Sequence, residues 1–392
     1  MTRNLCCILC QKPIPEKTKP EHVLLNALGG RLTTRKVICP NCNHFMGNGP
    51  DKDLADSTAF LRNICHFKAG DGDDAPQLRN LETNGERFDL KPGMQPQMRP
   101  RNPMDVQIDE DKIYTRISAY SDEEADKLAS GAAIKIAKHL GHKTPEVIEA
   151  IKQDILKERK SSFRPAPKVH QQLQFGTGRS QQSMAKACLV LWAMEVTNDE
   201  VNSNRYDAIR QFINTGVKDS ELVKLMKIDT RPLPPLPIEY GNNPNIVWAG
   251  CDEGGVYGYF RLYGAIGWRF LLSEQAVPHN LQVCLISNPF DNKLWRRIRN
   301  HDSPVGYDWV NAQWDSWPPQ FDQVVTRLEA MSAYAQKLSE DTWLPQLVRQ
   351  GLSRAGCCEG DLVTEQHVSA FSQHVGRAIS AYILQKDIPD SE

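Results

Sequence analysis

The sequence contains no long apolar run and no export signal. None of its hydrophobic stretches approaches the roughly 18 consecutive apolar residues that a membrane-spanning helix needs. The N-terminal MTRNLCC lacks the apolar core of a secretory signal peptide. The 11 cysteines then favour metal binding or free thiols, because disulfides persist mainly in oxidising compartments. We therefore expect a cytoplasmic protein without a membrane partner.

The chain also has almost no net charge, at −1 over 392 residues. It therefore lacks the overall basic character that marks many nucleic-acid-binding proteins. The charge is nevertheless uneven, since residues 1–49 contain seven Lys or Arg and only two Glu. Any contact with nucleic acid must be local, and this N-terminal segment is the first place to look for it.

No internal repeat is present, and helical and strand patterns follow one another irregularly, which predicts an α+β fold. We expect a small cysteine-rich module at residues 1–66, a strand-loop and two-helix connecting region at 67–165, and a C-terminal α+β domain at 166–392 of unknown role. The basic run 293–299 is read either as a solvated helix or turn or as a nucleic-acid contact. Two separate helices are expected at 321–339 and 342–355.

The strongest local pattern is a pair of Cys-x-x-Cys motifs, Cys7 with Cys10 and Cys39 with Cys42. In each motif both thiolates can face one metal, and four of them can complete a tetrahedral Zn²⁺ site. Cys6 could replace Cys7, although its spacing to Cys10 is less usual. We predict a structural zinc bound by the two matched pairs.

Residues suited to chemistry lie between and just after these pairs. Glu21 and His22 precede the turn sequence Ala-Leu-Gly-Gly at 27–30, and Asn43 directly follows the last cysteine. Successive side chains of a regular strand point to opposite faces. A bend or bulge would therefore be needed for Glu21 and His22 to reach one centre.

Taken in order, CxxC, EHV, ALGG, CxxCN and a following Gly resemble the HNH endonuclease family, in particular its four-cysteine zinc-binding branch with the ββα-metal fold. The resemblance covers residues 7–47. It implies that the cysteines hold a structural zinc, that Glu21 and Asn43 hold a catalytic Mg²⁺ or Mn²⁺, and that His22 is the general base. The candidate nucleic-acid contacts include Arg31, Arg35 and Lys36, each of which could equally be an ordinary exposed residue of a turn. His44 is a further candidate, as an alternative ligand or a phosphate contact, and its other reading is an exposed helix residue.

One expected residue is absent. The family's middle asparagine, which orients the histidine, has no counterpart in Thr-Thr-Arg-Lys at 33–36. His22 must then find its hydrogen-bond partner elsewhere, for example at a backbone carbonyl.

Three functional hypotheses follow. The first is a metal-dependent HNH endonuclease that hydrolyses phosphodiester bonds of double-stranded DNA, as in restriction or phage defence. The second is a zinc-stabilised module that binds nucleic acid or protein without hydrolysis. The third is a nuclease gated by a ligand that its C-terminal domain senses. The sequence leaves open whether the protein is a homo-oligomer or works with a partner protein.

Overall fold

The structure is a computed structural model of the chain, and its architecture is α+β, as predicted. It describes residues 5–83, 86–99, 102–109, 112–119, 121–142, 144–157, 162–163, 173–174, 176–217, 227–252, 254–275, 281–312, 318–358, 360–384 and 388–389. Among these residues no helix combines the length and apolarity needed to cross a membrane.

Residues 1–76 and 172–336 form one compact unit, and residues 77–171 and 337–392 form a second. The N-terminal module therefore shares its unit with much of the region that follows residue 171. The boundaries at 66 and 165 drawn from composition stay a prediction about domains.

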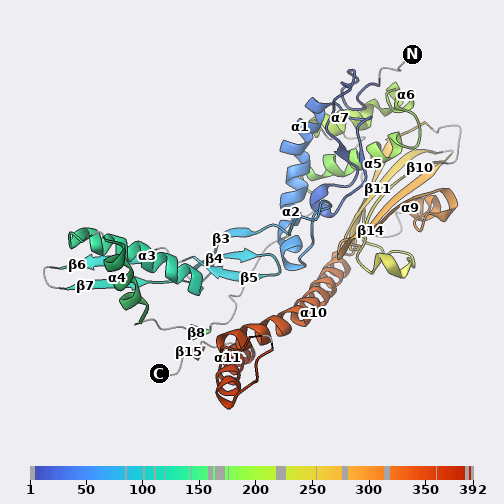
Figure 1. The fold of residues 1–392 in the computed structure, drawn as a ribbon. Helices are drawn as coiled ribbons and strands as arrows, with labels where there is room; N and C mark the ends of the chain where they lie inside the picture. The colour runs from blue at the N-terminus through green and yellow to red at the C-terminus, as the bar shows by residue number, and fades with distance from the viewer. Residues whose placement is uncertain are drawn as a thin grey trace. The chain divides into compact units, whose positions relative to one another are not determined.

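The N-terminal module is a short hairpin followed by two helices (Figure 1). Strand β1 (Glu21–His22) pairs antiparallel with β2 (Thr33–Thr34), and the short 3-10 helix η1 (Asn26–Leu28) lies between them. Gly29 ends η1 with a φ of +84°, a conformation that glycine adopts without steric cost. Helices α1 (Pro40–Asn48) and α2 (Pro50–Ile64) each begin with proline at the first helical position, which suits it because the missing N–H has no helical partner there.

The rest of the first unit is built on a six-stranded antiparallel sheet in the order β14-β13-β10-β11-β12-β9. Its strands are β9 (Lys227–Asp229), β10 (Asn245–Asp252), β11 (Gly255–Leu262), β12 (Ile266–Ser273), β13 (Gln282–Asn288) and β14 (Asp291–Arg299). The prediction of a helix or turn at 293–299 is wrong. Pairing with β13 places this run in an edge strand instead, because tertiary pairing overrides the local preference of a charged segment.

Helix α5 (Ser180–Ala193) lies against the central strands of this sheet, and all of its residues are buried (Figure 1). A helix buried on every side is expected to be apolar all round, as its second half is. Shorter helical elements accompany it: α6 (Asn198–Val201), η2 (Asn204–Tyr206), α7 (Asp207–Thr215), η3 (Ile238–Tyr240), η4 (Asn300–Asp302) and α9 (Tyr307–Asn311).

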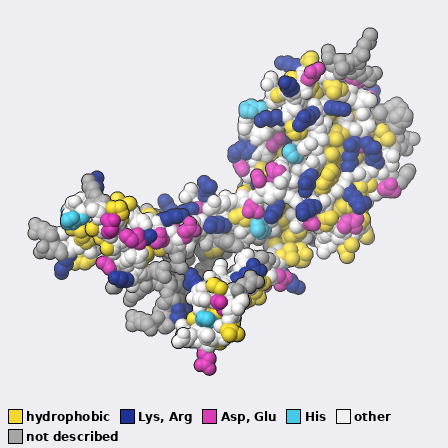
Figure 2. All heavy atoms as spheres, in the orientation of Figure 1, with side chains coloured by type: hydrophobic (Ala, Val, Ile, Leu, Met, Phe, Trp, Pro, Cys, Tyr) yellow, Lys and Arg dark blue, Asp and Glu magenta, His cyan; other side chains and the backbone are white. Residues whose placement is uncertain are grey.

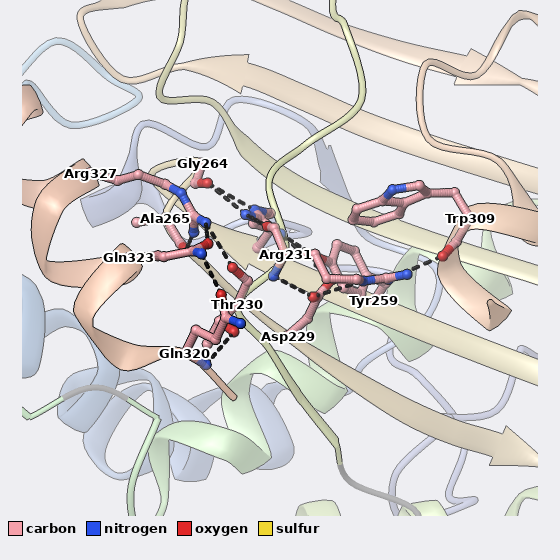
Figure 3. Close-up of polar contacts among 11 residues, drawn as sticks. Asp229, Thr230, Arg231, Tyr259, Gly264, Ala265, Trp309, Gln320, Gln323 and Arg327 are labelled. Carbon is pink, nitrogen blue, oxygen red and sulfur yellow. Dashed lines mark hydrogen bonds and ion pairs between the residues drawn. The ribbon is translucent and has the colours of Figure 1, made fainter. Parts of the chain in front are cut away.

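A network of arginines braces the end of the sheet next to β9 (Figure 3). The Asp229 carboxylate accepts from Arg231 at 3.0 Å and from the Tyr259 hydroxyl at 2.9 Å. The fully buried Arg261 donates to that same hydroxyl at 2.9 Å and to Gly264 O at 3.0 Å.

Helix α10 (Phe321–Arg354) joins this network through Arg327, which donates to the carbonyls of Ala265 and Thr230, each at 2.7 Å. The network is therefore a structural clamp between the sheet and the start of the helix. The expectation of two helices at 321–339 and 342–355 is wrong, since α10 continues through Pro345. Proline removes one helical hydrogen bond, and here the flanking turns retain the helix.

The second unit contains a three-stranded sheet, a hairpin and helices. The sheet comprises β3 (Leu78–Thr83), β4 (Glu86–Lys91) and β5 (Gln95–Met98), and the hairpin comprises β6 (Met104–Ile108) and β7 (Ile113–Ile117). Helices α3 (Asp122–His139) and α4 (Pro145–Lys157) follow, and α11 (Glu365–Leu384) and the pair β8 (Ser162–Phe163) and β15 (Ile388–Pro389) complete the unit. The Ser121 side chain caps α3 by accepting from Glu124 N at 3.2 Å.

Candidate metal centre and catalytic site

The four predicted cysteine ligands converge on one point. The sulfur atoms of Cys7, Cys10, Cys39 and Cys42 all lie within 4.8 Å of one another, with Cys10 Sγ 3.6 Å from Cys39 Sγ. Four sulfurs placed tetrahedrally around Zn²⁺ at the usual Zn–S distance would be separated by roughly 3.8 Å. The cluster therefore fits a structural zinc. Among the described residues it is the only such grouping of three or more Cys, His or acidic side chains.

Hydrogen bonds hold the two Cys-x-x-Cys segments in place from two directions. Ile8 N donates to Val37 O at 2.8 Å, which ties the first cysteine pair to the chain entering the second. From α7, the Arg210 guanidinium donates to Ile8 O at 2.9 Å, and Asn214 donates to Leu9 O at 2.8 Å. The zinc site is thus supported by residues 172–336 of the first unit, which we call the body, as well as by its own hairpin.

The hairpin places Glu21 and His22, the two candidate site residues of β1, in different environments. Glu21 lies opposite Thr34 and His22 opposite Thr33, in a regular register. Glu21 is buried and only 5% exposed, whereas His22 is half-buried. Neighbours along a strand face opposite sides of it, so the two residues meet different surroundings.

Glu21 belongs to a buried ionic cluster that the sequence did not reveal. The Lys186 ammonium, on α5, donates to Glu21 Oε1 and, at 2.7 Å, to Asp51 Oδ2 in the first turn of α2. The Ser183 hydroxyl donates to the other oxygen of Asp51 at 2.6 Å. Lys186 is 165 residues from Glu21 in the chain, so no local pattern could have predicted the contact.

The electrostatics of the cluster follow from this burial. Burial raises the pKa of Glu21, and the Lys186 charge opposes that effect. Burial alone would lower the pKa of Lys186, but Asp51 and Glu21 outweigh it and leave that pKa raised. We conclude that the lysine is charged at neutral pH.

His22 lies in the field of the same groups. Burial lowers the pKa of its imidazole, the Lys186 charge lowers it further, and Asp71 and Asp51 act in the opposite direction. A lowered pKa favours the neutral ring near pH 7, the form that can accept a proton.

Asp71 lies in a segment that the sequence suggested only as a loop. Asn26, four residues after His22, donates from Nδ2 to Asp71 Oδ2 at 2.7 Å and accepts from Asp71 N at 3.0 Å. A polar segment from outside the recognised pattern therefore contacts η1 and acts on the imidazole of His22.

The remaining predicted residues lie on α1 and on the loops before and after β2. Asn43 is half-buried in the first turn of α1, and its backbone N donates to Cys39 O at 3.0 Å. His44 is exposed, and its Nε2 lies 3.0 Å from Asn48 Nδ2 one turn later. Arg31, Arg35 and Lys36 are exposed as well.

The donor types on β1 and α1 suit a hard divalent cation, because a carboxylate and a carboxamide offer oxygen ligands. Glu21 and Asn43 are the residues that would hold it. Since Glu21 Oε1 already accepts from Lys186, the ion would be held by the other carboxylate oxygen of Glu21.

Comparison with known proteins locates this module within a family. Residues 7–58 match the family model for HNH endonucleases. The matched segment contains the four clustered cysteines, Glu21, His22, Asn43 and Asp51. Residues 7–58 are therefore an HNH-type module, which indicates a nuclease-type function acting on nucleic acid.

The match ends inside α2, so it describes the module and not the six-stranded sheet or the second unit. No curated protein and no solved structure matches the chain.

Proposed function

We propose that the protein is a metal-dependent HNH endonuclease that hydrolyses phosphodiester bonds of double-stranded DNA. The observation that carries the proposal is the family match at residues 7–58, whose four cysteines gather into one zinc-sized cluster. A zinc centre of this kind holds a short segment rigid; His22 lies between the two cysteine pairs in the chain, and Asn43 directly follows Cys42 on α1.

His22 is the general base in this proposal, and it takes a proton from the attacking water. A positioned imidazole contributes typically 10²- to 10⁴-fold to such a reaction, so about two to four orders of magnitude depend on it. Glu21 and Asn43 hold the catalytic Mg²⁺ or Mn²⁺. When bound, that ion neutralises charge on the scissile phosphate and on the departing oxygen.

The substrate contacts in this proposal are exposed on the loops that flank β2 and on α1: Arg31, Arg35, Lys36 and His44. Cationic side chains bind the phosphate backbone without reading sequence. Figure 2 shows many Lys and Arg side chains on the visible face of the first unit, with Asp and Glu among them. Such a mixed surface suits local phosphate contacts better than a continuous basic track.

By extension of the family resemblance, we propose that the protein acts in the cytoplasm, in restriction or phage defence. The body would then receive the signal or partner that controls cutting, and a homo-oligomer is compatible with this role.

A second candidate function is supported by one observation, the engagement of Glu21 by Lys186. A carboxylate already paired with a buried ammonium is a weaker metal ligand, which favours a zinc-stabilised module that binds nucleic acid without hydrolysis. The two functions differ in their affinity for a second divalent ion.

The test uses supercoiled plasmid incubated with the purified chain and Mg²⁺ or Mn²⁺. The wild type should convert the plasmid to nicked and linear forms, and His22→Ala should slow this by about 100-fold or more, because the general base is lost. His139→Ala, an exposed histidine on α3, is the matched control and should cut like the wild type.

Equal cutting by His22→Ala and the wild type would disprove the assignment of the base. No cutting by the wild type, together with plasmid binding and zinc as the sole bound metal, would instead support the non-hydrolytic module.

A further inference from the structure

We infer that Lys186 is a positioning residue for the nuclease site, through which the body sets the geometry of the HNH module. The inference rests on the proposed function. Lys186 lies outside the matched segment, on a helix that packs against the sheet. It acts through two carboxylates of the module, Glu21 and Asp51.

The first argument is the burial of the charge. The Lys186 side chain is 0% exposed, and the side chains of its partners Glu21 and Asp51 are 6% and 12% exposed. An ammonium without solvent is costly unless its donors are paired, and leaving one partner unmatched is strongly unfavourable. The three groups therefore hold one another in place, and movement of any one of them would leave a buried charge without its partner.

The second argument is where the two carboxylates sit. Glu21 immediately precedes His22 on β1, and Asp51 lies in the first turn of α2, directly after the helix that carries Asn43. One ammonium therefore connects the strand with the proposed base to the helical pair with the proposed metal ligand. The hairpin has only two residues in each strand, and an isolated two-stranded hairpin is marginal in water.

The third argument is that α5 contacts Asp51 twice. Ser183 and Lys186 are three residues apart, so both side chains project from one face of the helix. Ser183 binds one oxygen of Asp51 and Lys186 binds the other, at 2.6 Å and 2.7 Å. This pair of contacts fixes the orientation of the Asp51 carboxylate as well as its distance from α5. The start of α2 is therefore held in one position relative to α5.

The fourth argument is which oxygen is engaged. The Lys186 ammonium donates to Glu21 Oε1, so it aligns that carboxylate through one of its two oxygens.

The test compares plasmid nicking by full-length Lys186→Met with that by Arg261→Met, below the melting temperature of both. Each change removes a fully buried cation from the same unit, but Arg261, on β11, donates to Gly264, Tyr259 and Arg231 of the clamp and not to the two carboxylates of the module. We expect Lys186→Met to lower kcat by about 100-fold with little change in KM for plasmid, because misplacing reacting groups by an ångström costs that much. Arg261→Met should lose stability and retain kcat.

Asp51→Asn and its control Asp229→Asn repeat the comparison if either methionine variant fails to fold. Hydrogen exchange adds a readout independent of cutting: Lys186→Met and Asp51→Asn should lose protection at β1 and the start of α2, whereas the controls should not.

An unchanged kcat in Lys186→Met or Asp51→Asn, or an equal loss in their controls, overturns the inference and leaves the nuclease function intact. A wild type that never cuts refutes the nuclease function itself.

Discussion

Glu21 and His22 are neighbours in the chain with opposite environments. The carboxylate is buried against a lysine ammonium, whereas the imidazole is half-buried. Strand geometry produces the difference, because it directs consecutive side chains to opposite sides. At this scale, side-chain type indicates the chemistry that is available, and burial decides how far each group is shielded from solvent.

The residue-scale prediction concerns Glu21→Gln. The change leaves the fully buried Lys186 with Asp51 as its only anionic partner among the described residues. We expect the free energy of unfolding to fall by about 2 kcal/mol, the typical value of one charged hydrogen bond. Urea denaturation measures this, with the exposed Glu16→Gln as control. A difference between the two variants of less than about 0.5 kcal/mol, the usual scatter of surface substitutions, would contradict the buried ion pair.

At the scale of secondary-structure elements, the two Cys-x-x-Cys segments of the zinc site depend on each other and on α7. The first pair of cysteines is tied to the second by Ile8 N and Val37 O, and Arg210 holds the first from the body. A metal centre that joins segments distant in sequence contributes directly to folding. Loss of one cysteine ligand should therefore destabilise both Cys-x-x-Cys segments.

The prediction at this scale is that metal analysis of the purified chain finds about one zinc, the stoichiometry of a four-cysteine site. Cys10→Ser should abolish most of that zinc and lower the melting temperature, because three sulfurs no longer close the tetrahedron. Cys358→Ser, at an exposed cysteine outside the cluster, should change neither. Full zinc content in Cys10→Ser would show that the cluster is not the zinc site.

For the whole molecule, the main feature is that the module and the body share one core. Buried residues of the module such as Val23 and Leu54 belong to the same hydrophobic cluster as Leu189 of α5 and Phe260 of β11. Polar contacts across the same boundary include Asn245, which donates to Leu28 O at 3.1 Å, and Asn292, which donates to Ala69 O at 2.6 Å.

We therefore expect a fragment of residues 1–76 not to fold cooperatively, even with zinc. Cutting it from α5 exposes the apolar face of the module and leaves Glu21 and Asp51 without their buried cation. Circular dichroism during thermal unfolding, beside the full chain at equal zinc, tests this. A sharp two-state transition of the zinc-loaded fragment would show that the module is independent.

Elements with local signals were predictable from the sequence. Ser121 caps α3 and Pro145 begins α4, and both signals act within one helical turn. The edge strand β14 and the continuous α10 were not predictable, since pairing with β13 and packing against the sheet outweigh local preference.

By itself the sequence determined the type of module. The spacing of the two cysteine pairs predicts a metal site, and the order of motifs resembles the HNH pattern that the family model matches at residues 7–58. The tertiary structure alone decided that Glu21 faces Lys186. That contact joins residues far apart in the chain, and only the packing of α5 against the module and the sheet brings a buried ammonium to this carboxylate.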